Sequence, residues 1–234
     1  MGLFVFTQMT GGVGATTVAA NTTYMWPNRR RILIELGITG GDLMQKMDLS
    51  ITSAVSNDLI ESGWDIGKDS DPIPLSKLQE DAWELPAILA PAIPGVPSPG
   101  QPTWWENRMT MATRSDMDII CDIGKVAPEH LIMHNQILNV ATVIVGVIGK
   151  LSDAKMVGER LAAYRDRLAL LLVSPQKTLP QEVTDTTGVQ CLGVLPRNPD
   201  IENRFWKNIL VSDDRKSRDY HNGIASLAVK LGGN

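Results

Sequence analysis

A short segment rich in glycine and threonine, Met9–Thr17, constrains the fold of this chain more than any other part of the sequence. A compact apolar run, Leu3–Thr7, precedes it, and Thr17–Met25 follows with the composition of a helix that stops at Pro27. A buried strand, a glycine-rich loop and a helix in this order form a unit in which loop amides and the helix amino terminus can bind phosphate. The segment therefore predicts an α/β fold with a ligand site at the loop.

Further apolar runs along the chain alternate with segments of helical composition, which is typical of a parallel sheet covered on both faces. We predict one domain over residues 1–234, a doubly wound, mostly parallel sheet in three layers, with ligands at the edge where the strands end. The stretch Ser53–Gln101, which holds most of the prolines, is expected to be helices and a long surface loop. The predicted strands are Leu3–Thr7, Arg31–Leu36, Leu85–Ala90, Met117–Ile123, Ala141–Ile148, Leu168–Ser174 and Gln190–Leu195. The predicted helices are Thr17–Met25, Asp42–Met47, Trp104–Thr113, Ser152–Leu161 with a serine cap, and Ile224–Leu231.

Composition excludes several classes of protein. A formal net charge of −4 gives no global sign of a nucleic-acid partner. The two cysteines, Cys121 and Cys191, are far apart, which argues against a disulfide scaffold, a zinc ribbon or an iron–sulfur cluster. No run approaches the ~20 apolar residues of a membrane span, and the amino terminus lacks the basic start of a signal peptide. We therefore expect a cytoplasmic protein with no transmembrane segment.

The loop follows the spacing of a P-loop, G-x-x-x-x-G-K-[ST], but lacks its charge. Gly14 and Thr16 stand at the second glycine and at the magnesium ligand, whereas Met9 and Ala15 replace the first glycine and the lysine. The missing lysine removes a charged contact of about 1.5–3 kcal/mol, which weakens binding roughly ten- to a hundredfold. Phosphoryl transfer depends more strongly on positive charge, so we expect weak or no hydrolysis. The nucleotide-binding residues expected in the loop are Gly11, Gly12, Val13, Gly14, Ala15, Thr16 and Thr17.

The segment TGGVGATTVAAN, which begins at Thr10, resembles the deviant Walker A loop of the MinD/ParA superfamily, which usually reads KGGVGKTT. In that family a signature lysine precedes the glycine pair and reaches the nucleotide of a dimer partner, and here Thr10 has that position. Both family lysines are therefore replaced. The GGVGATT form is similar to that of the CpaE/TadZ branch, the MinD-like proteins of type IV and Tad pilus assembly. The resemblance implies a P-loop NTPase fold of the SIMIBI type.

Two later segments extend the resemblance toward the metal and catalytic positions. RILIELGITGGDLMQKMDLS, from Arg31, resembles the family's switch I segment and places Glu35 at its first acidic position, while Gly37 departs from the second. DIICDIG, from Asp118, matches the Walker B and switch II strand. The resemblance implies that Asp122 is a catalytic residue near magnesium, which Thr16 also ligates.

A third segment, VQCLGVLPRN, resembles the family's strand and loop beside the nucleotide base. It implies an adenine-side role for Pro196 and Asn198. The preceding strand ends in Ser174, where relatives usually carry an asparagine that contacts the base.

The resemblance implies ATP or ADP with Mg²⁺ as cofactor, a homodimer, and a protein partner in a larger machine. It implies a nucleotide-responsive localisation or assembly factor for a pilus, secretion or conjugation machine, recruited by a partner to the membrane or a pole. Two alternatives stay open: an active ParA-type ATPase for DNA or cargo partitioning, and a pseudo-ATPase scaffold that binds no nucleotide. DNA binding is not favoured, because acidic residues interleave the basic ones between Arg204 and Arg218. The candidates for a substitute cation are Lys46, Lys125 and Arg197.

Two other groups of side chains are interpreted as surface. His130 and His134 are four residues apart on an expected helix but lack the pattern of a zinc protease, so we expect a helix surface. Arg29–Arg31 precedes a strand and is expected to be a solvated turn.

Overall fold

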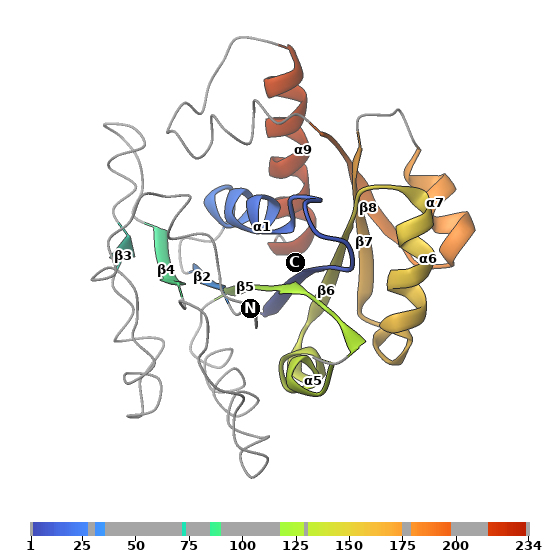
Figure 1. The fold of residues 1–234 in the computed structure, drawn as a ribbon. Helices are drawn as coiled ribbons and strands as arrows, with labels where there is room; N and C mark the ends of the chain where they lie inside the picture. The colour runs from blue at the N-terminus through green and yellow to red at the C-terminus, as the bar shows by residue number, and fades with distance from the viewer. Residues whose placement is uncertain are drawn as a thin grey trace.

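The computed structural model describes residues 2–27, 31–35, 72–73, 85–89, 118–128, 131–174, 179–197 and 215–232. They form an eight-stranded sheet in the order β3-β4-β2-β5-β1-β6-β7-β8 (Figure 1). All strand pairs are parallel except β3 with β4, so the predicted doubly wound, mostly parallel sheet is confirmed. The strands are β1 Leu3–Gln8, β2 Arg31–Glu35, β3 Pro72–Ile73, β4 Leu85–Leu89, β5 Asp118–Lys125, β6 Val143–Ile148, β7 Leu168–Ser174 and β8 Cys191–Pro196. The helices are α1 Ala15–Tyr24, α5 Leu131–Val140, α6 Leu151–Arg160, η4 Ala162–Tyr164, α7 Pro180–Thr187 and α9 Arg215–Gly232.

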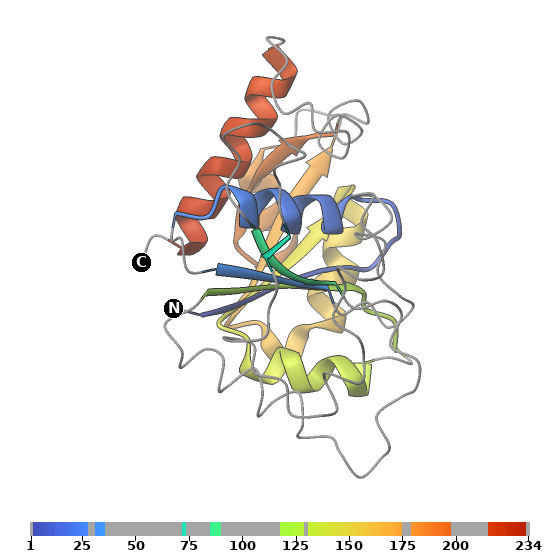
Figure 2. The same ribbon diagram turned by 90° about the vertical axis from the view of Figure 1, so that its left-hand side faces the viewer.

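Helices cover both faces of the sheet (Figure 2), which gives the three layers that the sequence predicted. One core lies between the sheet and α1 and α9, and it includes Phe6, Val18 and Ile224. The other lies under α5, α6 and α7, and it includes Leu138 and Val157. Successive side chains of a strand point to opposite faces, so the continuous apolar strands supply both cores.

The first helix, α1, is buried along most of its length although half of its residues are polar. Asn21 Nδ2 donates to the carbonyl of Thr17 at 2.8 Å, and Thr23 Oγ1 donates to that of Ala19 at 2.8 Å. These bonds satisfy polar groups that would otherwise be costly to bury. A polar helix can therefore pack between the sheet and α9.

Several sequence predictions need correction. α9 begins at Arg215 rather than Ile224, and β3, η4 and α7 were not predicted. Ser152 does not cap α6, because the helix begins after Lys150, which has extended backbone and no side-chain cap bond. The predicted helices Asp42–Met47 and Trp104–Thr113 lie outside the described residues, as does most of Ser53–Gln101.

Two side chains expected at the surface are buried instead. Arg31 begins β2 with 5% of its surface exposed, and its Nε donates to the carbonyl of Thr23 at 2.7 Å. His134 lies on α5 with 2% of its surface exposed, and His130 is outside the described residues. Neither position could be placed before the neighbouring elements were known.

Candidate functional site

The loop after β1 turns into α1 through two glycines in left-handed backbone conformation. Gly12 has φ +74° and Gly14 has φ +85°, a region that favours glycine because it lacks a Cβ. Gly14 is the capping residue of α1 and supplies no side-chain acceptor, and the first helical bond runs from the amide of Val18 to its carbonyl at 2.9 Å. The amides of Ala15, Thr16 and Thr17 therefore have no acceptor within the helix and remain for a ligand.

Space lies open in front of the loop tip. A Cβ built on Gly11 or on Gly12 would meet no heavy atom within 4 Å, and both residues are exposed. Packing therefore does not require glycine at these two positions. Their backbone is accessible to a ligand, as in a loop that binds phosphate through its amides.

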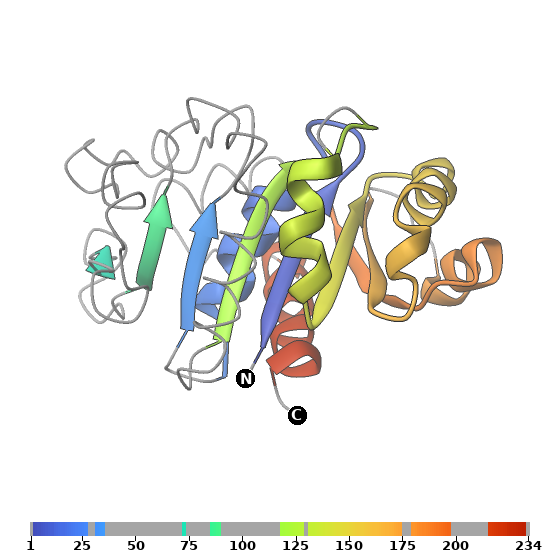
Figure 3. The same ribbon diagram turned by 90° about the horizontal axis from the view of Figure 1, so that it is seen from below.

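The segment after β5 is held against the end of β1. Thr7 Oγ1 donates to the carbonyl of Gly124 at 3.0 Å, and the amide of Val126 donates to the carbonyl of Gln8 at 2.9 Å. The amide of Gly124 donates to Asp122 Oδ1 at 2.9 Å. Figure 3 shows the loop after β1 and the segment after β5 at the same edge of the sheet.

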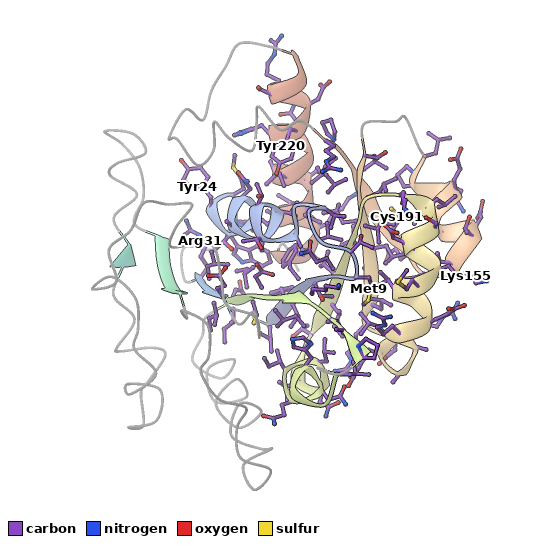
Figure 4. The ribbon with its side chains drawn as sticks, viewed as in Figure 1. Met9, Tyr24, Arg31, Lys155, Cys191 and Tyr220 are labelled. Carbon is purple, nitrogen blue, oxygen red and sulfur yellow. The ribbon has the colours of Figure 1, made fainter. Side chains whose placement is uncertain are left out.

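Met9 is part of the core, because only 3% of its surface is exposed. It lies on the side of the sheet that α6 covers (Figure 4), and its Sδ is 3.5 Å from Arg160 Nη1. The same nitrogen donates to the carbonyl of Val126 at 3.0 Å. Methionine at the first glycine position of the motif thus anchors the start of the loop to α6.

The start of α6 approaches the loop from β6. Thr10 Oγ1 donates to Asp153 Oδ2 at 3.2 Å, and Asp153 has only 4% of its surface exposed. Val13 packs on Gly149, where a Cβ would lie 3.0 Å from Val13 Cγ1. Sequence reasoning missed Asp153, although its place in the first turn of a helix after a strand was a signal that it faces the ligand edge.

Arg197 reaches the loop from the other end of the chain. Its backbone amide, just after β8, donates to the carbonyl of Ser174 at 3.1 Å. Its side-chain Nη2 donates to the carbonyl of Gly12 at 3.0 Å. Of the three candidate cations, Arg197 thus contacts the loop backbone, Lys125 is exposed at the end of β5, and Lys46 lies outside the described residues.

No family model matches the chain, and no curated protein matches its sequence. Solved structures match over nearly its whole length. A ParA family ATPase from Chlorobium tepidum TLS has a TM-score of 0.68 at 17% identity, covering 95% of this chain and 98% of that one. A chain of the MinC:MinD cell division protein complex from Aquifex aeolicus also has a TM-score of 0.68 at 17% identity, covering 100% and 97%. The septum site-determining protein MinD from Pyrococcus horikoshii OT3, complexed with Mg-ADP, has a TM-score of 0.64 at 14% identity, covering 98% and 96%.

The chain has the MinD/ParA fold. In this fold, an α/β P-loop NTPase architecture, the loop after the central strand β1 lies where the strand order changes direction, and ligands of doubly wound sheets bind there. The predicted fold class is thus confirmed at the level of architecture.

The fold brings most of the sequence-predicted site residues to one edge. β2 and β5 pair with Glu35 opposite Asp122, and both side chains are buried, with 2% and 1% of their surfaces exposed. Asp122 pairs in turn with Phe6 of β1, two residues before the last residue of that strand, Gln8. Two carboxylates therefore stand beside the end of the strand that carries the loop.

The residues predicted to lie beside the adenine are further away in the chain and in the sheet. Pro196 ends β8 opposite Ser174, and β6 and β7 separate β8 from β1. Asn198 lies outside the described residues. Among the described residues, Arg197 is the link from this segment to the loop.

A nucleotide at this site would contact the loop backbone rather than a lysine. Neither Ala15, which is 1% exposed at the first position of α1, nor Thr10, which donates to Asp153, carries a charge. In the part of the chain that the structure describes, no three His, Cys, Asp or Glu side chains gather as a metal site. A magnesium ion at Thr16 and Asp122 would therefore need phosphate oxygens and water as further ligands.

The two cysteines are held mainly as neutral thiols by burial. Burial raises the pKa of the Cys121 thiol well above its usual value, and the charge of Asp122 adds to the shift. Burial also raises the pKa of the Cys191 thiol. Both thiols are thus poor nucleophiles and poor metal ligands.

The described helices include none that is long and apolar enough to cross a lipid bilayer.

Proposed function

We propose that this chain is a nucleotide-responsive localisation or assembly factor of the CpaE/TadZ type, with weak or no hydrolysis. It acts as a single domain over residues 1–234, in the cytoplasm, on a pilus, secretion or conjugation machine. The observation that carries the proposal is a loop with the backbone geometry for phosphate and no lysine. Gly12 and Gly14 adopt the required left-handed conformations, whereas Thr10 and Ala15 replace the two lysines.

Nucleotide binding is supported by the amides that the loop leaves without helical acceptors and by the open space at Gly11 and Gly12. The Pyrococcus MinD protein, which shares the fold, is complexed with Mg-ADP. In this chain Thr16 and Asp122 would hold the magnesium ion. The ion would offset phosphate charge that the loop itself does not neutralise.

Weak hydrolysis is supported by the charges at the site and by the contacts after β5. Positive charge at the transferred phosphoryl group supplies much of the rate enhancement in phosphoryl transfer. The hydroxyl of Thr10 is engaged by Asp153, and the segment from Gly124 to Val126 is bonded to β1 and to Arg160. Hydrolysis that needs this segment to rearrange would have to break those bonds.

The same edge of the sheet is the proposed dimer surface, where two copies meet with their loops face to face. A bound nucleotide would then lie between the two copies and determine how tightly they associate. The MinC:MinD complex is an assembly of a protein with this fold and a different protein. We propose that this chain likewise has a protein partner, which recruits it to the membrane or a pole.

Calorimetry with ATP and ADP, together with mass measurement with and without magnesium, tests the proposal. We expect both nucleotides to bind and Mg-ATP to raise the dimer fraction. The variant Ala15→Lys should bind roughly ten- to a hundredfold more tightly, because it restores a charged contact. An unchanged affinity in that variant would mean that the loop is not the phosphate site. Sustained ATP turnover would instead support an active ParA-type ATPase.

One observation favours a second candidate, a scaffold that binds no nucleotide. The Asp153 carboxylate lies 3.2 Å from Thr10 Oγ1 and is nearly buried beside a loop that has lost both lysines. A negative charge there opposes phosphate. If ATP produces no binding heat in calorimetry and no change in the measured mass, the scaffold function would be supported and the nucleotide-responsive function would be wrong.

A further inference from the structure

The side chain of Arg197 makes a long-range contact that the loop itself does not need. Its Nη2 donates to the carbonyl of Gly12, 185 positions away in sequence, and the bond is exposed to solvent. An exposed hydrogen bond of this kind adds little to stability. Gly12 and Gly14 are already fixed by the turn into α1.

The backbone holds Arg197 in place while leaving its charge available. Its amide donates to the carbonyl of Ser174, the last residue of β7, which fixes where the side chain begins. Among the described residues no carboxylate forms an ion pair with its guanidinium. The bond to Gly12 engages one of the five N–H donors of arginine and leaves the others for an anion.

The charge lies beside the open part of the loop. Gly11 and Gly12 are exposed and have no heavy atom within 4 Å in the direction of a Cβ, and the guanidinium bonds the carbonyl of Gly12. A phosphate held by the loop amides would thus lie within the reach of a side chain that already contacts the loop. Arginine suits this task, because its planar fork can donate two bonds to phosphate oxygens.

We infer that Arg197 supplies the positive charge that Thr10 and Ala15 no longer provide, and that it binds the phosphates of the nucleotide in the loop. The inference rests on the proposed nucleotide binding and names the cation of that site. Without nucleotide the guanidinium donates to the Gly12 carbonyl, and with nucleotide it donates to phosphate oxygens. This contact would also tie the segment after β8 to the occupied loop.

The test compares nucleotide affinities of four proteins by calorimetry: the wild type, Arg197→Ala, Arg197→Gln and Arg165→Ala. Arg165 is the matched control, because it is also exposed and its Nη2 donates to a backbone carbonyl, that of Thr187, at 3.1 Å. We expect Arg197→Ala to bind ATP and ADP roughly ten- to a hundredfold more weakly, the loss of a charged hydrogen bond. Arg165→Ala should match the wild type, and thermal melting without nucleotide should be similar for all four.

The glutamine variant removes the charge and keeps a shorter polar side chain that still carries N–H donors. We expect Arg197→Gln to bind as weakly as Arg197→Ala. Wild-type affinity in Arg197→Gln would overturn the inference, because binding would then not depend on the charge of the side chain. Wild-type affinity in Arg197→Ala would also overturn it while leaving the proposed function intact. If the wild type itself binds no nucleotide, the nucleotide-responsive function fails and the inference fails with it.

Discussion

Two charged residues at opposite ends of the same parallel sheet, Asp118 and Arg197, lie in opposite environments. At the end where strands begin, Asp118 is 4% exposed and accepts from the amide of Gly2 at 2.9 Å and from Trp26 Nε1 at 2.8 Å. Arg31 lies opposite Asp118 in the β2–β5 register and is equally buried. At the end where strands finish, Arg197 is exposed and bonds a glycine carbonyl of the loop.

The difference distinguishes a charged side chain that stabilises the fold, Asp118, from one that is available to a ligand, Arg197. A buried charge that loses its partners is costly, so the carboxylate of Asp118 needs hydrogen-bond partners within the protein, and Gly2 and Trp26 supply them. An exposed charge beside an open loop stabilises the fold little and can bind a phosphate. We therefore expect substitution of Asp118 to change the free energy of unfolding, and substitution of Arg197 to change nucleotide affinity.

The largest expected effect is on stability, in Asp118→Ala. The change leaves the amide of Gly2 and Trp26 Nε1 without their buried acceptor, which we expect to cost about 3 kcal/mol. Urea unfolding, with the free energy extrapolated to water, measures it. Arg197→Ala is the control at the other end and should lose less than about 0.5 kcal/mol. Equal losses in the two variants would contradict the comparison.

A smaller loss is expected in Trp26→Phe, which keeps an aromatic ring. The ring centroids of Trp26 and Phe4 are 4.7 Å apart, and phenylalanine preserves much of that contact. The indole donor to Asp118 is lost, so we expect a loss of about 2 kcal/mol in the free energy of unfolding. Nucleotide affinity of the folded protein should be unchanged, and a change in affinity would mean that the two ends are coupled.

These charges also mark what the sequence could and could not predict. The apolar strands and the loop were predictable because each signal is local, within a run of a few residues. Arg31 was expected to be solvated. Its burial depends on the pairing of β2 with β5, in which its partner Asp118 lies 87 positions later in the chain. The contacts of Asp153 and Arg197 with the loop depend in the same way on which elements the fold brings together.

The missed helices have a different cause. α7 buries one apolar residue, Val183, so its sequence shows almost no apolar periodicity. The amino-terminal half of α9 is polar, and the prediction covered only the part from Ile224 onward, where Leu227, Ala228 and Leu231 face the core. Hydrophobic pattern alone finds the part of a helix in which apolar residues recur every three or four positions.

The smallest expected effect on stability is at the loop, in a matched pair of variants. Gly12→Ala places an alanine at φ +74°, which costs about 1 kcal/mol, whereas Gly11→Ala, with open space at its Cβ and no positive φ, should be neutral. Urea unfolding separates them. Both methyl groups face the open side of the loop, so both variants should bind ATP more weakly than the wild type. If both variants bind ATP with wild-type affinity, the nucleotide does not bind at this loop.

The most direct test of the account is a calorimetric titration of the wild-type chain with Mg-ATP, alongside adenosine and Ala15→Lys. The account predicts that ATP binds the wild type, that Ala15→Lys binds it roughly ten- to a hundredfold more tightly, and that adenosine gains nothing from the added lysine. An absence of ATP binding in both proteins would contradict the claim that this loop binds nucleotide through its backbone.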